Sequence, residues 1–210
     1  AHSKISGAGE LKTLSNFGNL IIEGKLNTSR RQLNLFRETY FKEICKYSDD
    51  KAKFITDKLP HNFRYIPLIK LIFPESKIIH IKRDPSATCW SNFARYFNNG
   101  SLKYSYDLDN VVDYYLMYED LMDTWSRNFV DAYYTVTYEE LVCNYEVEIS
   151  SLLKYLGINV EPNCFEPHKN KRLVKTSSNK QVRKKIYTGS SETWRKFEPF
   201  LNGAFNRLTS

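Results

Sequence analysis

The chain has 210 residues, of which 41% are hydrophobic and 26% are charged, and its formal net charge is +7. This length and composition are typical of an ordered globular protein with one sizeable core, and they exclude a disordered or low-complexity chain. No stretch reaches the roughly 18 apolar residues that a membrane-spanning helix needs, so the sequence predicts no membrane span. The basic excess favours an anionic partner without saying which one.

Cysteine and histidine usage gives expectations about location and metals. The four cysteines lie far apart and form no Cys-x-x-Cys pair, and we find no secretion signal. This pattern favours a reduced setting, so the sequence predicts a cytoplasmic protein. The histidines are scattered and have no metal-ligand spacing, so no metal cofactor is expected.

Hydrophobic periodicity predicts alternating helices and strands along the chain. Helices are predicted at residues 29–47, 61–73, 85–97, 110–128, 139–156 and 192–200. Buried strands are predicted at residues 53–56, 77–82 and 132–137. Residues 6–9 read as a turn, because no Lys-Ser/Thr pair follows them as it would in a phosphate-binding loop. This alternation predicts an α/β fold with a parallel sheet flanked by helices, and three strands are few for such a sheet.

The most informative segment follows the strand predicted at 77–82. Asp84 can cap the next helix and Pro85 can begin it, because proline has no N–H and a fixed φ. Arg83 is therefore expected at the carboxyl end of a parallel strand, where open sheets place ligand crevices. Ser91 follows about two helical turns later. A guanidinium and a hydroxyl can converge on one anion, most naturally a phosphate; the plainer alternative is a surface arginine and an ordinary helix serine.

The C-terminal region, residues 158–210, is predicted to be mostly irregular. Between His168 and Lys185 it carries eight lysines and arginines and no acidic residue. This run is either a solvated loop or a flap over a multiply charged ligand. Aromatic residues do not alternate with the basic ones and no nucleic-acid-binding motif is present, so no nucleic-acid partner is predicted.

Several short motifs stand in a characteristic order along the chain. They are Gly7-Ala8-Gly9-Glu10-Leu11, Phe54-Ile55-Thr56-Asp57-Lys58-Leu59-Pro60, Ile79-His80-Ile81-Lys82-Arg83-Asp84-Pro85, Val136-Thr137-Tyr138-Glu139-Glu140-Leu141 and Thr176-Ser177-Ser178-Asn179-Lys180-Gln181-Val182-Arg183, followed by Trp194. Together they resemble the sulfotransferases that use 3′-phosphoadenosine 5′-phosphosulfate (PAPS). The likeness is closest to bacterial sulfotransferases joined to tetratricopeptide repeats, with the tyrosylprotein sulfotransferases as cousins.

The resemblance implies a single P-loop-like α/β sulfotransferase domain over residues 1–210. It also implies that the family's first strand-loop-helix unit, which holds the 5′-phosphosulfate, is not among these residues. A helical-repeat domain upstream is a candidate partner on the same ground.

The resemblance further implies transfer of a sulfuryl group from PAPS to an acceptor hydroxyl or amine, without a metal ion. Glu10 matches the family's catalytic base, and Lys58 would stabilise the departing phosphate oxygen. Arg83 and Ser91 match the pair that binds the 3′-phosphate of the donor. A glutamate that merely begins a helix and a lysine that merely caps a turn are the plainer alternatives.

Four further residues are assigned to donor binding by the same resemblance. Tyr138 would line the adenine, which suits an aromatic ring, although in a chain with 15 tyrosines an ordinary core position is the plainer reading. Ser178 matches a serine that contacts the donor, and Arg183 matches a basic position that could close over the 3′-phosphate. Lys184 could serve there as a point charge.

Two questions stay open at this stage. The acceptor can be a protein, a glycan or a small molecule. A non-catalytic module that binds adenosine 3′,5′-bisphosphate (PAP), another anion or a protein partner, and retains the same fold, is the alternative to an enzyme.

Overall fold

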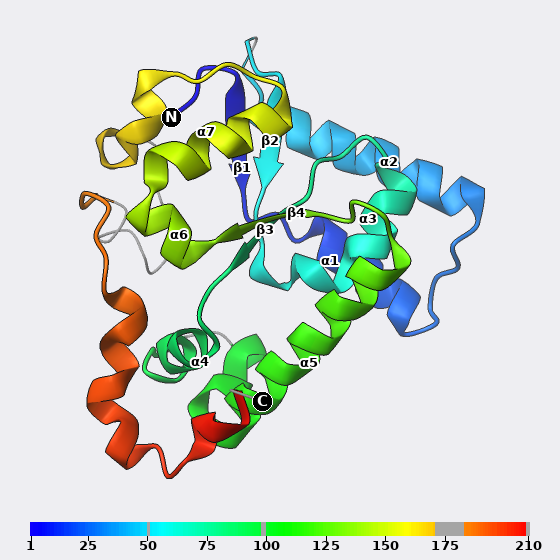
Figure 1. Ribbon diagram of the computed structural model, residues 1–210. Coiled ribbons are helices and arrows are strands. Elements are labelled where there is room, and N and C mark those ends of the chain that lie inside the picture. The colour runs from blue at the N-terminus through cyan, green and yellow to red at the C-terminus, as the bar shows by residue number, and fades with distance from the viewer. Residues whose placement is uncertain (50, 98–99, 171–182, 209–210) are drawn as a thin grey trace. The chain divides into compact units, whose positions relative to one another are not determined.

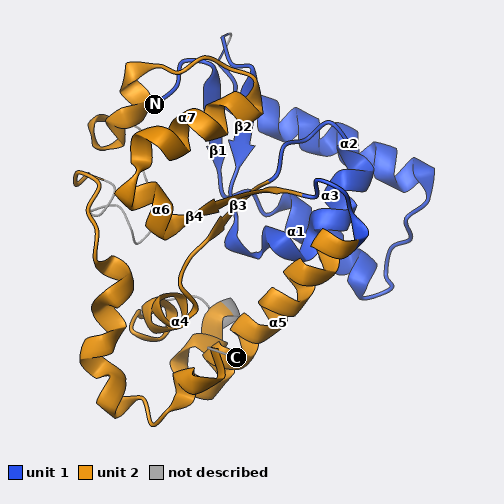
Figure 2. Ribbon diagram, viewed as in Figure 1, with its two compact units in different colours: residues 1–78, 128–132 blue, residues 79–127, 133–210 orange. Residues whose placement is uncertain are grey.

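The computed structural model describes residues 1–49, 51–97, 100–170 and 183–208, and Figure 1 shows their arrangement into helices and strands. The chain divides into two compact units, shown in Figure 2. Unit 1 comprises residues 1–78 and 128–132, and unit 2 comprises residues 79–127 and 133–210. Each unit contains a two-stranded parallel sheet with helices around it, which confirms the predicted α/β class.

The described residues of unit 1 form two strands and three α-helices, with short 3-10 helices between them. Its elements are β1 (Ile5–Gly9), α1 (Thr13–Ile22), α2 (Arg30–Ile44), η1 (Cys45–Tyr47), β2 (Phe54–Asp57), η2 (Pro60–Tyr65) and α3 (Ile66–Ile72). The helix predicted at 29–47 and the strand predicted at 53–56 are confirmed, and Pro67 begins a new helix because it occupies the first turn of α3.

Strand β1 corrects the prediction of a turn at residues 6–9. It pairs in parallel with β2, from Ile5 opposite Phe54 to Gly7 opposite Thr56. Small residues such as Ser6 and Gly7 have weak intrinsic preference for strands, so the pairing with β2 decides the conformation here.

The core of unit 1 holds helices α1, α2 and α3 together. Leu14, Phe36, Tyr65, Ile72 and Phe73 form one buried cluster. A second, smaller cluster of Ala8, Leu11 and Ile44 packs the end of β1 against the end of α2. These apolar contacts hold the strand end in place.

Unit 2 contains the other two strands. Its elements are β3 (Ile79–Lys82), α4 (Pro85–Phe93), η3 (Gly100–Tyr106), α5 (Leu108–Asn128), β4 (Tyr134–Thr137), α6 (Tyr138–Cys143), α7 (Tyr145–Leu156), η4 (Pro162–Phe165), η5 (Pro167–Lys169), η6 (Ser190–Phe200) and η7 (Ala204–Leu208). Both predicted strands are present, and α4 begins as expected, with the Asp84 carboxylate accepting a hydrogen bond from the Ala87 N–H (2.7 Å).

The helices of unit 2 differ from the prediction in their boundaries and in the type of the terminal one. Helix α4 ends at Phe93 rather than at 97, and the helix predicted at 139–156 is divided at Asn144 into α6 and α7. The terminal helix has 3-10 rather than α geometry. Gly157 ends α7 as predicted, because its φ of +67° is in the left-handed region that glycine adopts readily.

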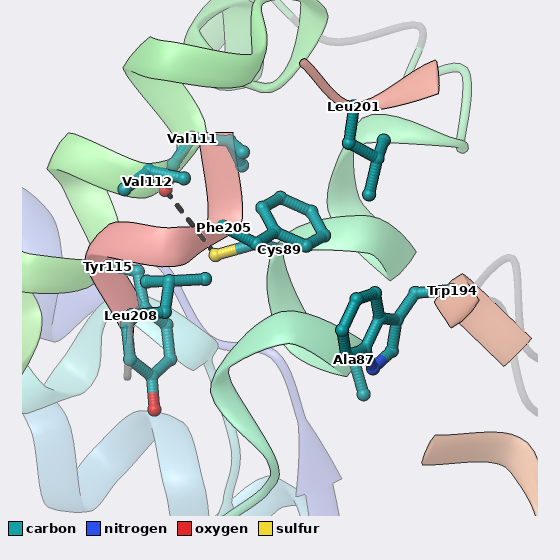
Figure 3. Close-up of a cluster of buried hydrophobic side chains, with 9 residues drawn as sticks. All are labelled: Ala87, Cys89, Val111, Val112, Tyr115, Trp194, Leu201, Phe205 and Leu208. Atoms are coloured by element: carbon teal, nitrogen blue, oxygen red, sulfur yellow. Dashed lines mark hydrogen bonds between the residues drawn. The ribbon is translucent and has the colours of Figure 1, made fainter. Parts of the chain in front are cut away.

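The core of unit 2 attaches the C-terminal segment to α4 and α5. Figure 3 shows Trp194 of η6 beside Ala87 of α4, with Phe205 near Cys89. The Trp194 and Phe205 rings meet edge to face with centroids 5.7 Å apart. The Cys89 thiol donates to the Val111 carbonyl (3.8 Å), and burial raises its pKa to about 12. This cluster positions the start of η6.

Among the residues that the structure describes, no helix combines the length and the apolar character that crossing a membrane requires.

Candidate functional site

The two predicted catalytic residues, Glu10 and Lys58, meet at the carboxyl ends of β1 and β2. The strand pairing shifts by one residue near the end, because Gly9 rather than Ala8 lies opposite Asp57. The extra residue forms a bulge, and Gly9 has a φ of +91°. The next residues on the two strands are therefore Glu10 and Lys58, and their side chains form an ion pair.

The Glu10–Lys58 pair is accessible from solvent. The side chain of Glu10 is 37% exposed and that of Lys58 is 65% exposed. An ion pair with this exposure contributes little to stability, so stability does not explain its presence. A carboxylate and an ammonium group side by side at a strand end can instead accept a proton and stabilise a developing negative charge.

Asp57 lies behind this pair and was not predicted as a site residue. Its Oδ1 accepts a hydrogen bond from the Leu11 N–H (3.1 Å), and its Oδ2 accepts one from the Tyr40 hydroxyl (2.9 Å). Burial raises the pKa of the Asp57 carboxyl above its usual value, although both hydrogen bonds act in the opposite direction. The local signal for Asp57 was the Asp-Lys dipeptide, but the residues that bind its carboxylate, Leu11 and Tyr40, are distant in sequence.

In unit 2 the first residues after β3 and β4 are in contact. The last strand pair joins Lys82 and Thr137, so Arg83 and Tyr138 follow it at the same edge of the sheet. The Arg83 guanidinium carbon lies 4.9 Å from the centroid of the Tyr138 ring. This is within the range of a cation–π contact, so these two predicted donor-binding residues lie together.

Arg83 is also bound by the start of η6. Its Nε donates to the Ser191 hydroxyl (3.2 Å), and its Nη2 donates to the Ser190 carbonyl oxygen (2.8 Å). The hydroxyl groups of Ser190 and Tyr138 lie 2.8 Å apart. Its Nη1 makes no hydrogen bond with any part of the chain that the structure describes. One edge of the guanidinium is thus held by the chain and another is available to an anion.

Glu139 links the three segments around Arg83. Its Oε1 accepts hydrogen bonds from the Ser191 hydroxyl (2.5 Å) and from the Asp84 N–H (3.2 Å). Burial opposes ionisation of Glu139, but these hydrogen bonds together with its own backbone contact outweigh that effect and lower its pKa. Neither Glu139 nor the two serines was predicted as a site residue.

Three of the remaining predicted donor-binding residues lie in the part of the chain that the structure describes. Ser91 lies in the last turn of α4, is half-buried, and makes no hydrogen bond with Arg83. Arg183 and Lys184 are exposed, at the start of the last described segment. Ser178 lies outside the described residues, so the structure gives no position for it.

A cavity of about 420 Å³ lies elsewhere in unit 2, between α5 and the β3–β4 pair. It is lined by His80, Lys82, Tyr118, Glu119, Asp120, Met122, Asp123, Tyr133 and Thr135. His80 lies in mid-strand, its Nε2 is 2.5 Å from the Tyr118 hydroxyl, and burial lowers its pKa to about 4. Across residues 1–49, 51–97, 100–170 and 183–208, no group of three or more His, Cys, Asp or Glu side chains could hold a metal ion.

Comparison with known proteins shows the family of the chain. A sequence model described as the sulfotransferase family matches residues 22–162, which is more than half of the chain. An uncharacterized protein of Aquifex aeolicus (strain VF5) is 33% identical over 217 residues, covering 96% of this chain and 28% of that protein. The omega-hydroxy-beta-dihydromenaquinone-9 sulfotransferase Stf3 of Mycobacterium bovis is 30% identical over 147 residues, covering 65% of this chain and 37% of that enzyme. The chain thus spans well under half the length of either relative.

Solved structures show the same fold at lower identity. The sulfotransferase domain of the Synechococcus PCC 7002 olefin synthase matches with a TM-score of 0.57 and 20% identity, over 88% of this chain and 66% of that domain. The sulfotransferase domain of the curacin biosynthetic pathway matches with a TM-score of 0.55 and 14% identity, over 83% and 68% of the two chains. Given the family match over residues 22–162, the chain belongs to the sulfotransferase family.

Proposed function

We propose that this chain transfers a sulfuryl group from PAPS to an acceptor hydroxyl or amine. The observation that carries the proposal is the guanidinium of Arg83 at the end of β3, stacked on Tyr138 and held on one edge by the start of η6. A planar cation in a fixed orientation, with a donor edge available, suits bidentate recognition of a phosphate. The extra 3′-phosphate is what distinguishes PAPS from ordinary adenine nucleotides.

Donor binding follows from this arrangement. The Nη1 edge of Arg83 would bind the 3′-phosphate, with Ser91 as the hydroxyl contributed by α4. The adenine would stack on the face of Tyr138 that Arg83 does not cover. Ser178, Arg183 and Lys184 complete the proposed donor site as predicted from the sequence.

In the transfer step, Glu10 would act on the acceptor and Lys58 on the leaving group. Glu10 would accept the proton of the acceptor as the acceptor oxygen or nitrogen attacks the sulfur. The bond between sulfur and the bridging phosphate oxygen breaks, and its electron pair stays on the 5′-phosphate. Lys58 would stabilise that developing charge. The products are the sulfated acceptor and PAP.

The proposal specifies the chemical group that accepts the sulfuryl group and not one acceptor compound. Proteins, glycans and small molecules are all proposed acceptors. Because the relative from Mycobacterium bovis is named for a hydroxylated menaquinone, a hydroxylated lipid quinone belongs in the first acceptor panel. Incubating the full-length protein with labelled PAPS and such a panel tests transfer directly, and a protein that binds PAP without transferring label would be a binding module.

Calorimetry tests the donor site without an acceptor. The full-length protein should bind adenosine 3′,5′-bisphosphate more tightly than AMP, and Arg83→Ala should remove that preference. Arg127→Ala is a matched control, because Arg127 is 68% exposed and its ion pair with Asp123 (3.9 Å) lies at the surface. Equal affinity of the wild-type protein for both nucleotides would refute the assignment of a 3′-phosphate site.

A further inference from the structure

The carboxylate of Asp57 connects three segments of unit 1 behind the Glu10–Lys58 pair. Asp57 is the last residue of β2 and directly precedes Lys58. Its Oδ1 accepts from the N–H of Leu11, the residue after Glu10, and its Oδ2 accepts from the hydroxyl of Tyr40 in α2. One side chain therefore joins the end of β2, the chain leaving β1 and the helix packed beside them.

The ion pair depends on such a connection because neither of its side chains is fixed by packing. Glu10 and Lys58 are 37% and 65% exposed. The backbone of Lys58 is fixed, since its N–H donates to the Gly9 carbonyl (2.8 Å). Glu10 lies beyond the last strand pair, and Leu11 after it is held both by its packing with Ala8 and Ile44 and by the hydrogen bond that its N–H donates to Asp57.

Tyr40 orients Asp57 from the opposite side. The Tyr40 ring packs against Phe36 and Phe73, with centroids 5.9 and 5.0 Å away, so its hydroxyl is aimed by the apolar core. Burial raises the pKa of the Tyr40 hydroxyl above its ordinary value. The phenol therefore keeps its proton and donates a hydrogen bond to Asp57.

Burial and the carboxylates near Asp57 raise its pKa, and the hydrogen bonds from Leu11 and Tyr40 act in the opposite direction. The titratable groups facing it are Tyr40 and Glu43 of α2 and Glu10 after β1. Glu43 is itself engaged by the Thr13 hydroxyl at the start of α1. An ionised Asp57 can accept from both of its donors at once, whereas a protonated carboxyl would present a hydroxyl to one of them.

We propose that Asp57, oriented by Tyr40, is a positioning residue that holds Glu10 opposite Lys58 for the transfer step. This inference rests on the proposed function. Positioning of a catalytic group is worth much of an enzyme's rate enhancement, and residues that support such a group do so through their own locked hydrogen bonds. A loss of this support should reduce turnover without weakening donor binding.

Three variants of the full-length protein test the inference. Tyr40→Phe keeps the ring and removes one hydrogen bond, so kcat should fall about fivefold. Asp57→Asn keeps the shape and removes the charge, so kcat should fall by about 10-fold to 100-fold. In both variants the KM for PAPS and the affinity for adenosine 3′,5′-bisphosphate should stay within about twofold. Tyr47→Phe, in exposed η1, is the matched control and should change nothing.

Hydrogen exchange, together with thermal stability, separates positioning from a merely structural role. Hydrogen exchange of the peptide that contains Leu11 should accelerate in Asp57→Asn and Tyr40→Phe but not in Tyr47→Phe. Unchanged exchange, unchanged kcat, or a parallel loss of kcat, nucleotide affinity and thermal stability would each overturn the inference. If the wild-type protein transfers no label, the proposed function fails on that result, and hydrogen exchange still decides whether Asp57 holds the chain after Glu10.

Discussion

The guanidinium of Arg83 lies over the ring of Tyr138, with its central carbon 4.9 Å from the ring centroid. The two residues meet because each is the first residue after one of two paired parallel strands. The Ser190 carbonyl holds one edge of the same guanidinium. Its orientation is therefore set by the chain before any ligand binds, and a ligand loses less entropy in ordering it.

Tyr138 should contribute to nucleotide binding through its ring rather than its hydroxyl. Tyr138→Ala removes the cation–π contact and the stacking surface, so the affinity for adenosine 3′,5′-bisphosphate should fall by about 0.5–2 kcal/mol. Tyr138→Phe keeps the ring and loses only the hydroxyl contact with Ser190 (2.8 Å), at a cost of about 1 kcal/mol or less. Calorimetric titration of both variants measures the difference, and equal losses would contradict this assignment.

Glu10 should matter for turnover and not for donor affinity. Glu10→Gln leaves a side chain of the same size that cannot accept the proton of the acceptor, so kcat should fall by about 10²-fold to 10⁴-fold. Binding of adenosine 3′,5′-bisphosphate should be unchanged. The matched control is Glu38→Gln, at an exposed position of α2. A variant with wild-type kcat would remove Glu10 from the mechanism.

The partly buried imidazole of His80 should make stability depend on pH. Burial, with a smaller effect from Lys82, lowers its pKa from 6.5 to about 4. Between those values the unfolded chain binds a proton that the folded chain does not, so stability falls as pH decreases from 6.5 to 4. The loss from this group alone should reach about 2–3 kcal/mol at the acid end.

His80→Gln should remove this contribution while lowering stability at pH 7 through the lost contact with Tyr118. Urea unfolding of both proteins at pH 7, 6 and 5 measures the two slopes. Parallel slopes would show that His80 is not the titrating group.

Replacement of Trp194 should lower both the stability of the protein and its affinity for the nucleotide. Its side chain is 9% exposed and packs in the cluster with Ala87 and Phe205. Trp194→Ala should destabilise the protein by about 3–5 kcal/mol. Because η6 also carries the serines that hold Arg83, bisphosphate binding should weaken as well. Phe200→Ala, at a 75% exposed position of the same segment, is the control and should have little effect.

Local sequence signals predicted much of the structure. The apolar run before Arg83 and the Asp84-Pro85 cap defined β3 and the start of α4, because strand periodicity and capping depend on neighbouring residues. The same logic placed Lys58 at a strand end. The resemblance assigned Glu10 and Lys58 to catalysis, but the ion pair between them was not predicted, because β1 itself was interpreted as a turn.

The features that escaped prediction depend on long-range contacts. Strand β1 consists of small residues after Ile5 and acquires its conformation from β2, about 50 positions later in the chain. The serine that holds the Arg83 Nε is Ser191, 108 residues away, and no local pattern signals such a partner. Likewise, the role of Asp57 becomes visible only once Tyr40 and Leu11 are seen beside it.

Ala8 is the extra residue of β1 that decides which residue comes opposite Lys58. Regular pairing without the bulge would place Ala8 opposite Asp57 and Gly9 opposite Lys58, so the glutamate would lie one position further along and, since strand side chains alternate, would turn toward the other face. A relative could then retain every motif and still hold its glutamate away from the lysine. When members of the family are compared, the pairing at the end of β1 should therefore be read together with the glutamate itself.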